Sequence, residues 1–368
     1  MAKAYKVGII GRTGGGNYGH GLDRVWQDVP NVEVAAVADE NDKGRTEAVN
    51  RCAAKTGYAD YREMLDRERP DIVAICERWI DRHHELAMAC AEHGCHMYME
   101  KPFTRTLEEA DAVVAACEMR HLKLAIAHNN RYTPQLAMIK RLIRTGEIGD
   151  VLELRIRGKE DRRGGGEDLW VLGTHMLDLM RAVNGDVESC YARVTDKGHS
   201  VTAADVYDGN EGIGPLAGDG IDAMYRFANG ANGYFASHRD MAGRPSRFGL
   251  RIHGSKGLIA LDSGYLKPGY ILKDSSWSNG TTDVDWQPIS SLGIGQSEPL
   301  EHGPHGSNMA AALDLIDAIE NDRQPVSSMY DARAAVELIA AVFESHRRGG
   351  PVSLPLENRE NPLTMLNS

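Results

Sequence analysis

The sequence is short of cysteine, of phenylalanine and of basic residues. Among its 368 residues there are 6 cysteines and 5 phenylalanines, and Lys plus Arg number 42 against 53 Asp plus Glu. The net charge of -11 disfavours binding to nucleic acid and to anionic membrane surfaces. The cysteines form no C-x-x-C pair, so they indicate reduced, buried thiols of a cytoplasmic protein rather than a disulfide framework.

Long apolar runs are absent as well. No uninterrupted apolar stretch approaches the roughly 20 residues that a membrane span needs. The opening MAKAYKVGII lacks the apolar core and the cleavage site of a secretory signal. We therefore expect a cytoplasmic protein with neither a membrane nor nucleic acid as partner. The 39 glycines and 42% hydrophobic residues are typical of a globular chain with many tight turns, and the length favours about two domains.

From Tyr5 to about Arg131, short β-branched runs alternate with helical patterns. This alternation is typical of a parallel sheet with helices on both faces, which is a doubly wound α/β domain. The expected strands cover residues 6–10, 32–39, 71–76, 96–99 and 123–128, and the expected helices cover 41–56, 82–93 and 107–120.

The pattern changes after Gly149–Asp150. Residues 151–160 alternate like a half-exposed strand, and residues 221–239 and 247–262 have the pattern of hairpins with glycine turns. Because one face of an antiparallel sheet must be covered, we expect a helix over 168–183 to lie on it. Two more helices are expected over 308–320 and 331–347.

A glycine-rich turn, Gly11 to Gly19, follows the first expected strand and leads into a helical pattern through Leu22 and Trp26. Glycines at this place let the backbone approach a pyrophosphate, which the N–H groups of a helix N-terminus stabilise. The register departs from G-x-G-x-x-G, so we expect a reshaped or lengthened loop; an ordinary tight turn is the alternative. The residues expected to contact a dinucleotide here are Gly11, Arg12, Thr13, Gly14 and Gly16.

An acidic residue, Asp39, ends the second expected strand 28 positions after Gly11. A carboxylate at this place accepts hydrogen bonds from the adenosine ribose and repels a 2′-phosphate. The sequence therefore predicts NAD as cofactor, with NADP less favoured. Arg45 could favour NADP, but on the expected helix it is more simply a solvated residue.

Further motifs extend along the chain in a fixed order. They are KVGIIG, His83 upstream of EHGCHMYMEKP, Asn130–Arg131–Tyr132, GTHMLDL from Gly173, HGSKGLIAL from His253, and GGPVSLPL near the end. With these motifs the chain resembles, over nearly its whole length, the Gfo/Idh/MocA family of glucose-fructose oxidoreductase and inositol dehydrogenase.

The resemblance implies two domains. Residues 1–130 would form an NAD-binding Rossmann domain, and residues 131–368 an α+β domain for substrate binding and oligomerisation. The second domain would have an open, mainly antiparallel sheet with helices on one face, and its C-terminal helix could pack back on the first domain. We expect a homodimer or homotetramer, because relatives commonly pair such sheets.

The resemblance also implies site residues. In the family, the lysine of the E-K-P turn lies near the nicotinamide, and a histidine on the first helix of the second domain acts as acid and base. Lys101 matches the lysine and His175 the histidine, and Glu100 joins the expected cofactor contacts. An Asp that many members carry four residues before the histidine falls on Val171 here, which puts the usual orienting carboxylate in doubt.

The chemistry of alcohol oxidation favours the same pair. Removal of the hydroxyl proton needs a base of near-neutral pKa such as His175, and Lys101 can polarise the same oxygen. On a continuous helix Asp168, His175 and Asp178 share roughly one face, so Asp168 is predicted to replace the missing carboxylate and Asp178 to join the catalytic residues. The alternatives are a surface role for Lys101, a packing role for His175 bonded to Asp178, and helix capping for Asp168.

Polar residues at strand ends and in the loop before that helix could hold a polyol, although solvated loop charges are an equal alternative. They are Arg131, Tyr132, Lys159, Asp161 and Arg163.

Two pairs of histidines resemble metal ligands, but we predict no metal site. Gly and Pro between His302 and His305 break the spacing that would make the side chains converge. His83 and His84 are adjacent on an expected helix, where neighbouring side chains point apart.

The favoured function is NAD-dependent transfer of hydride between nicotinamide and a secondary hydroxyl of a sugar, sugar derivative or cyclitol. A glycoside-cleaving enzyme with tightly bound NAD, acting through transient oxidation, is one alternative. A non-catalytic sensor that binds NAD(H) is another.

Overall fold

The computed structural model describes residues 4–262, 269–280, 282–300 and 303–366. Contacts within the chain divide it into two compact units, and neither is continuous in sequence. The first unit consists of Met1–Asn129, Asn210–Gly214 and Pro304–Val336. The second unit consists of Asn130–Gly209, Pro215–Gly303 and Glu337–Ser368.

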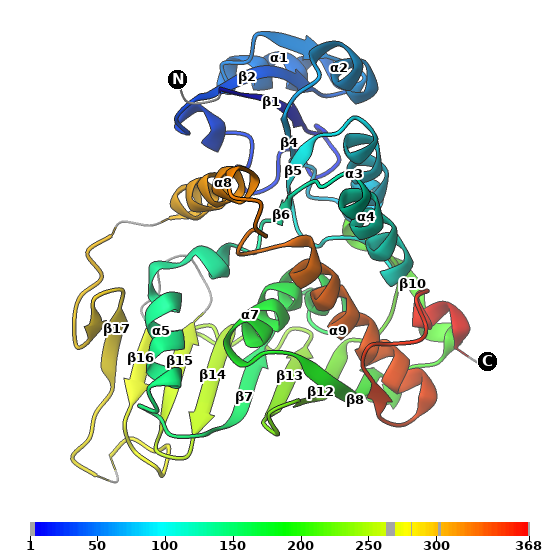
Figure 1. Ribbon diagram of the computed structural model, residues 1–368. Helices are drawn as coiled ribbons and strands as arrows, with labels where there is room; N and C mark the ends of the chain where they lie inside the picture. Colours follow the sequence, from blue (N-terminus) through cyan, green and yellow to red (C-terminus); the bar gives the residue numbers. More distant parts are fainter. Residues whose placement is uncertain (1–3, 263–268, 281, 301–302, 367–368) are drawn as a thin grey trace. The chain divides into compact units, whose positions relative to one another are not determined.

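The described part of the first unit contains a sheet of six parallel strands in the order β3-β2-β1-β4-β5-β6 (Figure 1). The order reverses between β1 and β4, and ligands of doubly wound sheets bind beyond the carboxyl ends of the strands at such a point. The predicted Rossmann sheet is confirmed. The strands are β1 (Tyr5–Ile10), β2 (Val32–Ala38), β3 (Thr56–Tyr58), β4 (Ile72–Ile75), β5 (His96–Met99) and β6 (Leu124–Ile126).

Helices connect these strands, and α3 and α4 lie side by side (Figure 1). The helix predicted over 41–56 is too long, because Ala53 has a positive φ of 50° that ends α1 and the chain then enters β3. Both β3 and α2 were absent from the prediction. The helices of this unit include α1 (Asp42–Arg51), α2 (Tyr61–Glu68), η2 (Ile80–Arg82), α3 (His83–Glu92), α4 (Leu107–Met119) and α8 (Pro304–Glu320).

The connection from β1 to β2 lacks the predicted α-helix. Residues 11–24 form turns, and only η1 (Val25–Gln27) is helical. Leu22, Val25 and Trp26 are fully buried, so their apolar spacing reflects burial and not an α-helix. The expectation that a helix N-terminus follows the glycine turn is therefore wrong. Positive φ angles, which an α-helix excludes, occur at Gly14, Gly16, Asn17, Gly19 and Gly21.

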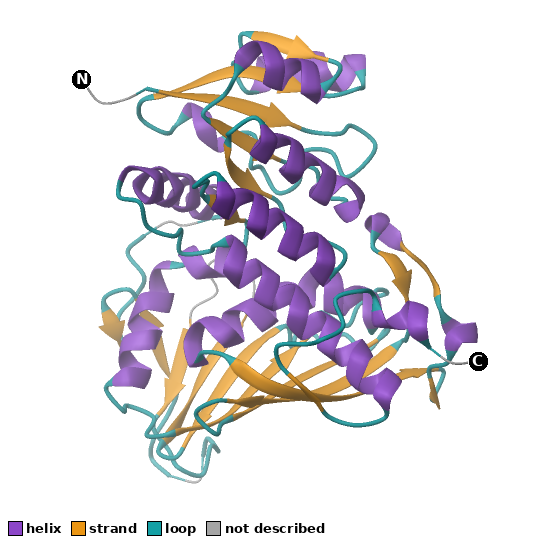
Figure 2. Ribbon diagram, turned by 45° about the vertical axis from the view of Figure 1, so that its right-hand side comes forward, coloured by secondary structure: helices purple, strands orange, loops and turns teal. Residues whose placement is uncertain are grey.

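The second unit is built on a large sheet, which Figure 2 shows with helices along one face. Its neighbouring strands pair antiparallel except β7 and β13, which are parallel, so the predicted mainly antiparallel sheet is confirmed. Both predicted hairpins are present, as β12–β13 and β14–β15. The strands are β7 (Val151–Arg157), β8 (Val187–Asp196), β9 (His199–Ser200), β12 (Gly220–Phe227), β13 (Asn232–His238), β14 (Gly249–Gly254), β15 (Gly257–Asp262), β16 (Gly269–Leu272), β17 (Gln287–Ser290), β18 (Gly293–Ile294) and β19 (Val352–Ser353).

One face of this sheet is covered by α5 (Pro134–Arg144), α7 (Thr174–Asn184) and the end of α9 (Met329–Arg348). Tyr225 of β12 donates to the carbonyl oxygen of Leu338 in α9 at 3.1 Å, which fixes helix and sheet together. The remaining short elements are η3 (Asn129–Tyr132), η5 (Ala203–Asp205), β10 (Tyr207–Gly209), η6 (Asn210–Gly212), β11 (Gly214–Leu216) and η7 (Pro362–Met365).

The helix predicted over 168–183 is present but not continuous. A short turn, α6 (Gly166–Asp168), is followed by the π-helical turn η4 (Leu169–Gly173) and then by α7. A π turn holds more residues than an α turn, so it rotates the side chains before it relative to those after it. The spacing that placed Asp168 on the face of His175 therefore does not apply.

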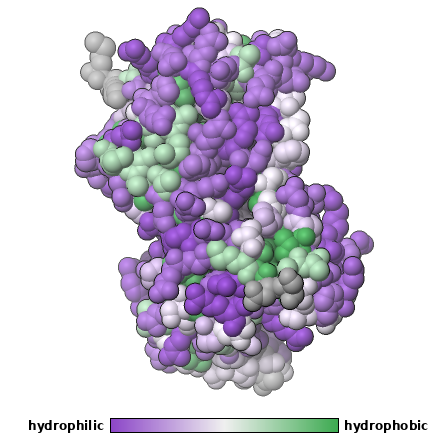
Figure 3. All heavy atoms as spheres, turned by 90° about the vertical axis from the view of Figure 1, so that its right-hand side faces the viewer, coloured by the Kyte–Doolittle hydropathy of each residue, from purple (hydrophilic) through white to green (hydrophobic). Residues whose placement is uncertain are grey.

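Hydrophilic side chains cover most of the surface that Figure 3 shows, in keeping with 26% charged residues. All six cysteines are buried and none is in a disulfide, and burial raises the pKa of the Cys52 thiol to about 12. Among the helices that the structure describes, none combines the length and apolar character needed to cross a membrane.

Candidate active site

The turn after β5 carries Glu100, Lys101 and Pro102, all of them buried. Glu100 Oε1 accepts a hydrogen bond from the backbone N–H of His20 at 2.7 Å and lies 2.8 Å from His20 Nδ1. Burial opposes ionisation of Glu100, but the charge and hydrogen bonds of His20 and the charge of Lys101 outweigh it and lower its pKa. A Cβ on Gly19 would lie 2.3 Å from Glu100 Oε1, so glycine is required there. Glu100 thus anchors the end of the glycine turn.

His83, at the start of α3, joins the ends of β4 and β5. Its Nδ1 lies 2.7 Å from the carbonyl oxygen of Pro102, and its Nε2 lies 2.7 Å from that of Glu77. Both nitrogens of the fully buried ring therefore face backbone carbonyl oxygens. His83 therefore fixes the turn that carries Lys101 to the segment after β4.

Asp39 follows β2 and is 2% exposed. Its Oδ2 accepts from the hydroxyls of Thr13 at 2.7 Å and Tyr18 at 2.8 Å, and its Oδ1 accepts from the backbone N–H of Asn41 at 2.9 Å. The Tyr18 ring lies against Gly11, where a Cβ would come within 2.2 Å of it. Burial, followed by the charge of Asp39, raises the pKa of Tyr18. The glycine turn is thus closed onto Asp39 through the side chains of Thr13 and Tyr18, of which Tyr18 was not predicted from the sequence.

Glu77 follows β4 and was also not predicted from the sequence. An acid directly after the buried run IVAIC is nevertheless a pattern from which it could have been predicted. The side chain is 1% exposed, and among the described residues neither of its oxygens has a hydrogen-bond donor. Burial raises its pKa to about 7, against the charges of Arg82 and Arg12.

In the second unit, His175 lies in the first turn of α7 and is partly exposed. Asp168, fully buried, accepts from the Ser237 hydroxyl at 2.5 Å and the backbone N–H of Glu160 at 3.0 Å, and it caps no helix. Burial raises its pKa, against the hydrogen bonds from Ser237 and Glu160. Asp168 thus ties the loop after β7 to β13, and its catalytic role stays a prediction.

The residues predicted to hold a substrate are engaged with neighbouring acids. Arg131 binds the carboxylate of Asp178 through Nε and a terminal nitrogen, at 2.8 to 3.0 Å. Arg163 binds Asp161 at 2.7 and 3.1 Å, and its side-chain hydrogen bond lowers the pKa of Asp161 to about 2. Tyr132, in η3, is partly exposed.

The structure thus gathers the predicted site residues into two sets. The first unit holds the expected cofactor contacts, which are Gly11, Arg12, Thr13, Gly14, Gly16, Asp39, Glu100 and Lys101. The second unit holds His175, Asp168, Asp178, Arg131, Tyr132, Lys159, Asp161 and Arg163.

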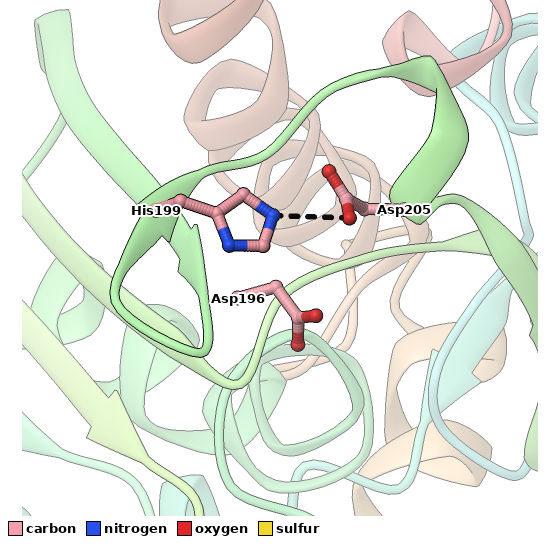
Figure 4. A group of neighbouring side chains, drawn as sticks. All are labelled: Asp196, His199 and Asp205. Atoms are coloured by element: carbon pink, nitrogen blue, oxygen red, sulfur yellow. Dashed lines mark hydrogen bonds and ion pairs between the residues drawn. The ribbon is translucent and has the colours of Figure 1, made fainter.

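Within the described chain, one group of three side chains has the composition of a metal site, namely Asp196, His199 and Asp205 (Figure 4). His199 Nε2 lies 3.1 Å from Asp205 Oδ1, and Asp205 Oδ2 accepts from the backbone N–H and hydroxyl of Thr202 in a capping box. These hydrogen bonds account for the arrangement without an ion. Of the histidine pair considered earlier, His302 lies outside the described residues and His305 pairs with Asp28 at 2.9 Å.

Comparisons with known proteins agree with this architecture. Residues 5–128 match the family model described as oxidoreductase family, NAD-binding Rossmann fold, and residues 140–354 match the C-terminal alpha/beta domain of the same family. A levoglucosan dehydrogenase of Pseudarthrobacter phenanthrenivorans is 26% identical over 366 residues, which cover 87% of this chain and 89% of that protein. A D-apiose dehydrogenase of Rhizobium rhizogenes is 24% identical over 343 residues, 89% of this chain and 92% of that protein. A solved levoglucosan dehydrogenase, in complex with NADH and levoglucosan, shares the fold with a TM-score of 0.78 at 24% identity, over 96% of this chain and 100% of that one.

Proposed function

Because the chain belongs to the Gfo/Idh/MocA family of oxidoreductases, we propose that it is an NAD-dependent dehydrogenase of a sugar, sugar derivative or cyclitol. The reaction transfers hydride between nicotinamide and a secondary hydroxyl. The observation that carries the proposal is Lys101, a lysine only 2% exposed at the carboxyl edge of an NAD-type parallel sheet. The dehydrogenases of levoglucosan and D-apiose among its relatives support a carbohydrate substrate.

The residues at this edge fit a dinucleotide. Glu77 offers buried acceptor oxygens without donors, and Gly16 lets the glycine turn lie close to the segment after β4, where a Cβ would come within 2.6 Å of the backbone nitrogen of Trp79. Asp39, Glu40 and Glu77 line one small cavity at the ends of β2 and β4. Three carboxylates repel a 2′-phosphate, which favours NAD over NADP.

The catalytic roles follow from the chemistry of the reacting groups. A bound nicotinamide supplies the acceptor for the hydrogen that leaves carbon with its electron pair. His175 takes the hydroxyl proton in the oxidation and returns it in the reduction, and Lys101 donates to the same oxygen and stabilises its developing negative charge. Arg131, Tyr132, Asp161 and Arg163 contribute substrate contacts from the second unit.

A screen of NADH formation tests the proposal. The panel is inositols, aldoses, glycosides and sugar acids with NAD, followed by Lys101→Ala and His175→Ala on the best substrate. Each variant should lose about 100-fold or more in kcat/KM while keeping its melting temperature. Full turnover by both variants would refute the assignment. Glycoside cleavage without net NADH would favour the glycoside-cleaving alternative, and NADH binding without turnover on any compound would favour a sensor.

The open face of the large sheet supports a homodimer or homotetramer. Cross-strand pairing places a row of seven side chains on this face, six of which are Tyr, Met or Arg, residue types enriched at protein interfaces. Tyr191 and Met224 in this row are 49% and 40% exposed. The row runs through Tyr191, Met224, Tyr234, Arg155, Arg251, Ala260 and Tyr270.

Reduced, buried cysteines support a cytoplasmic location.

A further inference from the structure

Two buried carboxylates follow the strands on either side of β1, at the carboxyl edge of the parallel sheet. Asp39 follows β2, Glu77 follows β4, and β1 lies between these strands (Figure 1). Both line the same small cavity, together with Gly11 at the end of β1. An ionised carboxylate only accepts hydrogen bonds, so each buried oxygen needs a donor from the protein, from water or from a ligand.

The acceptor capacity of Asp39 is already used. Both oxygens accept from Thr13, whose N–H lies 3.3 Å from Oδ1 and 3.1 Å from Oδ2, in addition to the hydroxyl of Tyr18 and the N–H of Asn41. A ribose hydroxyl could bond Asp39 only by displacing one of these donors. Asp39 therefore acts on the glycine turn, whose conformation it holds.

Glu77 has the opposite environment. The nearest cations are Arg82 at 3.8 Å and Arg12 at 3.9 Å, beyond hydrogen-bonding distance. The same terminal nitrogens donate at shorter range to other acids, from Arg82 to Glu40 at 2.7 Å and from Arg12 to Asp81 at 2.9 Å. A buried carboxylate without donors destabilises the free protein. A ligand that brings hydroxyl donors removes this cost, so Glu77 is an acceptor at this edge that a ligand could use.

The position of the cavity indicates which part of a dinucleotide would reach Glu77. The cavity is also lined by Ala59 and Tyr61, which follow β3, so it lies on the β2–β3 side where doubly wound sheets hold the adenosine ribose. Its volume of about 10 Å³ is enough for about one water molecule. Arg82, which lines the cavity and donates to Glu40 at 2.7 Å, must therefore withdraw when a ribose enters.

We propose that Glu77 accepts hydrogen bonds from the adenosine ribose hydroxyls of the dinucleotide and excludes a 2′-phosphate, while Asp39 anchors the glycine turn. This inference rests on the proposed NAD dependence. It assigns the discrimination between NAD and NADP chiefly to Glu77, which follows β4. The acid that sequence spacing singled out, Asp39, follows β2 on the other side of β1.

Ligand binding to the free protein tests the assignment. Calorimetry with NADH, ADP-ribose and NADPH would compare the wild type with Glu77→Gln and with the control Glu33→Gln, an exposed acid near the start of β2, whose other end carries the cavity. Glu77→Gln should weaken both NADH and ADP-ribose by about tenfold or more, as for hydrogen bonds to a charged group, and should narrow the preference for NADH over NADPH. Glu33→Gln should stay within about threefold of the wild type for NADH and ADP-ribose.

Three outcomes would overturn the inference. Unchanged affinities and preference in Glu77→Gln would do so while leaving the proposed function intact. Weaker NADH with unchanged ADP-ribose would do so too, because Glu77 would then face the nicotinamide half. A wild type that binds no dinucleotide would overturn the proposed function and the inference together. If Glu77→Gln melts at a lower temperature, the variant Glu77→Asp decides between the outcomes. It should bind NADH more weakly than the wild type but still prefer NADH to NADPH. Loss of that preference would count against the assignment.

Discussion

Arg131 and Asp178 form a bidentate ion pair in which the arginine is 8% exposed and the carboxylate fully buried. The sequence assigned these residues to different tasks, one to the substrate and one to catalysis. Their pairing fastens η3, just after the last strand of the parallel sheet, to α7, the helix that carries His175.

Loss of one partner of this pair should destabilise the second unit. Asp178→Ala leaves a buried guanidinium without its counter-charge, so the free energy of unfolding in urea should fall by about 3 kcal/mol. Asp186→Ala is the control, because Asp186 pairs with Arg181 at 2.7 Å but is 76% exposed, and it should change stability little. Equal, small effects of both variants would contradict a structural role for the buried pair.

The contact between Gly11 and Tyr18 should appear as an energetic coupling. Gly11→Ala adds a methyl group within 2.2 Å of the Tyr18 ring and should cost about 1 to 3 kcal/mol of stability. In a Tyr18→Ala background the same change should cost much less, because the ring is gone. Urea unfolding of the wild type, both single variants and the double variant measures the coupling. Additive effects would mean that the ring does not lie on Gly11 in solution.

Ionisation of Glu77 should make the free energy of unfolding of the ligand-free protein depend on pH. Burial raises the pKa of Glu77 from 4.5 to about 7, with Arg82 and Arg12 opposing the shift and Asp81 and Glu40 adding to it. Between these values the folded state holds a proton that the unfolded state has released, so wild-type stability falls as pH rises, by up to about 1.4 kcal/mol per pH unit. The variant Glu77→Gln, which is used to measure this effect, leaves Asp39 in the same cavity unchanged.

The measurement is urea unfolding of wild type and Glu77→Gln at intervals from pH 5 to pH 8. The stability of the variant relative to wild type should increase up to about pH 7 and then level off. A constant difference across this range would show that Glu77 ionises as an exposed glutamate does.

The open sheet face should mediate self-association. Wild-type protein at micromolar concentration should scatter light as a dimer or tetramer, and Met224→Lys should shift it toward the monomer by placing a new charge in the row between Tyr191 and Tyr234. Met119→Lys is the control, because Met119 is 73% exposed on α4, which belongs to the first unit. A monomeric wild type, or equal effects of the two variants, would count against the face as an interface.

Buried strands of the parallel sheet could be predicted closely from the sequence. The strand predicted over 96–99 matches β5, and that over 6–10 differs from β1 by one residue, because strands covered on both faces stand out as apolar runs. By contrast, β3 has three residues, of which only Tyr58 is buried, so no run marks it. Helix α2 follows directly and was lost with it.

The candidate site was predictable only where a residue carries its own chemical signal. Lys101 and His175 stand in recognisable motifs, and Asp39 ends a strand. The closure of Tyr18 onto Asp39 joins residues 21 positions apart through a side-chain conformation that no local pattern encodes. The π turn before α7 was equally hidden, because Leu169, Trp170 and Val171 are all buried and leave no polar face to mark the helical register.

His83 couples two segments at the carboxyl edge of the parallel sheet. Its two ring nitrogens lie 2.7 Å from the backbone carbonyl oxygens of Glu77 and Pro102. One side chain therefore connects the segments that follow β4 and β5. A displacement of Glu77 by an entering ribose would be transmitted to the turn that carries Lys101. Binding at the adenosine end would then adjust the position of the amine at the reactive end.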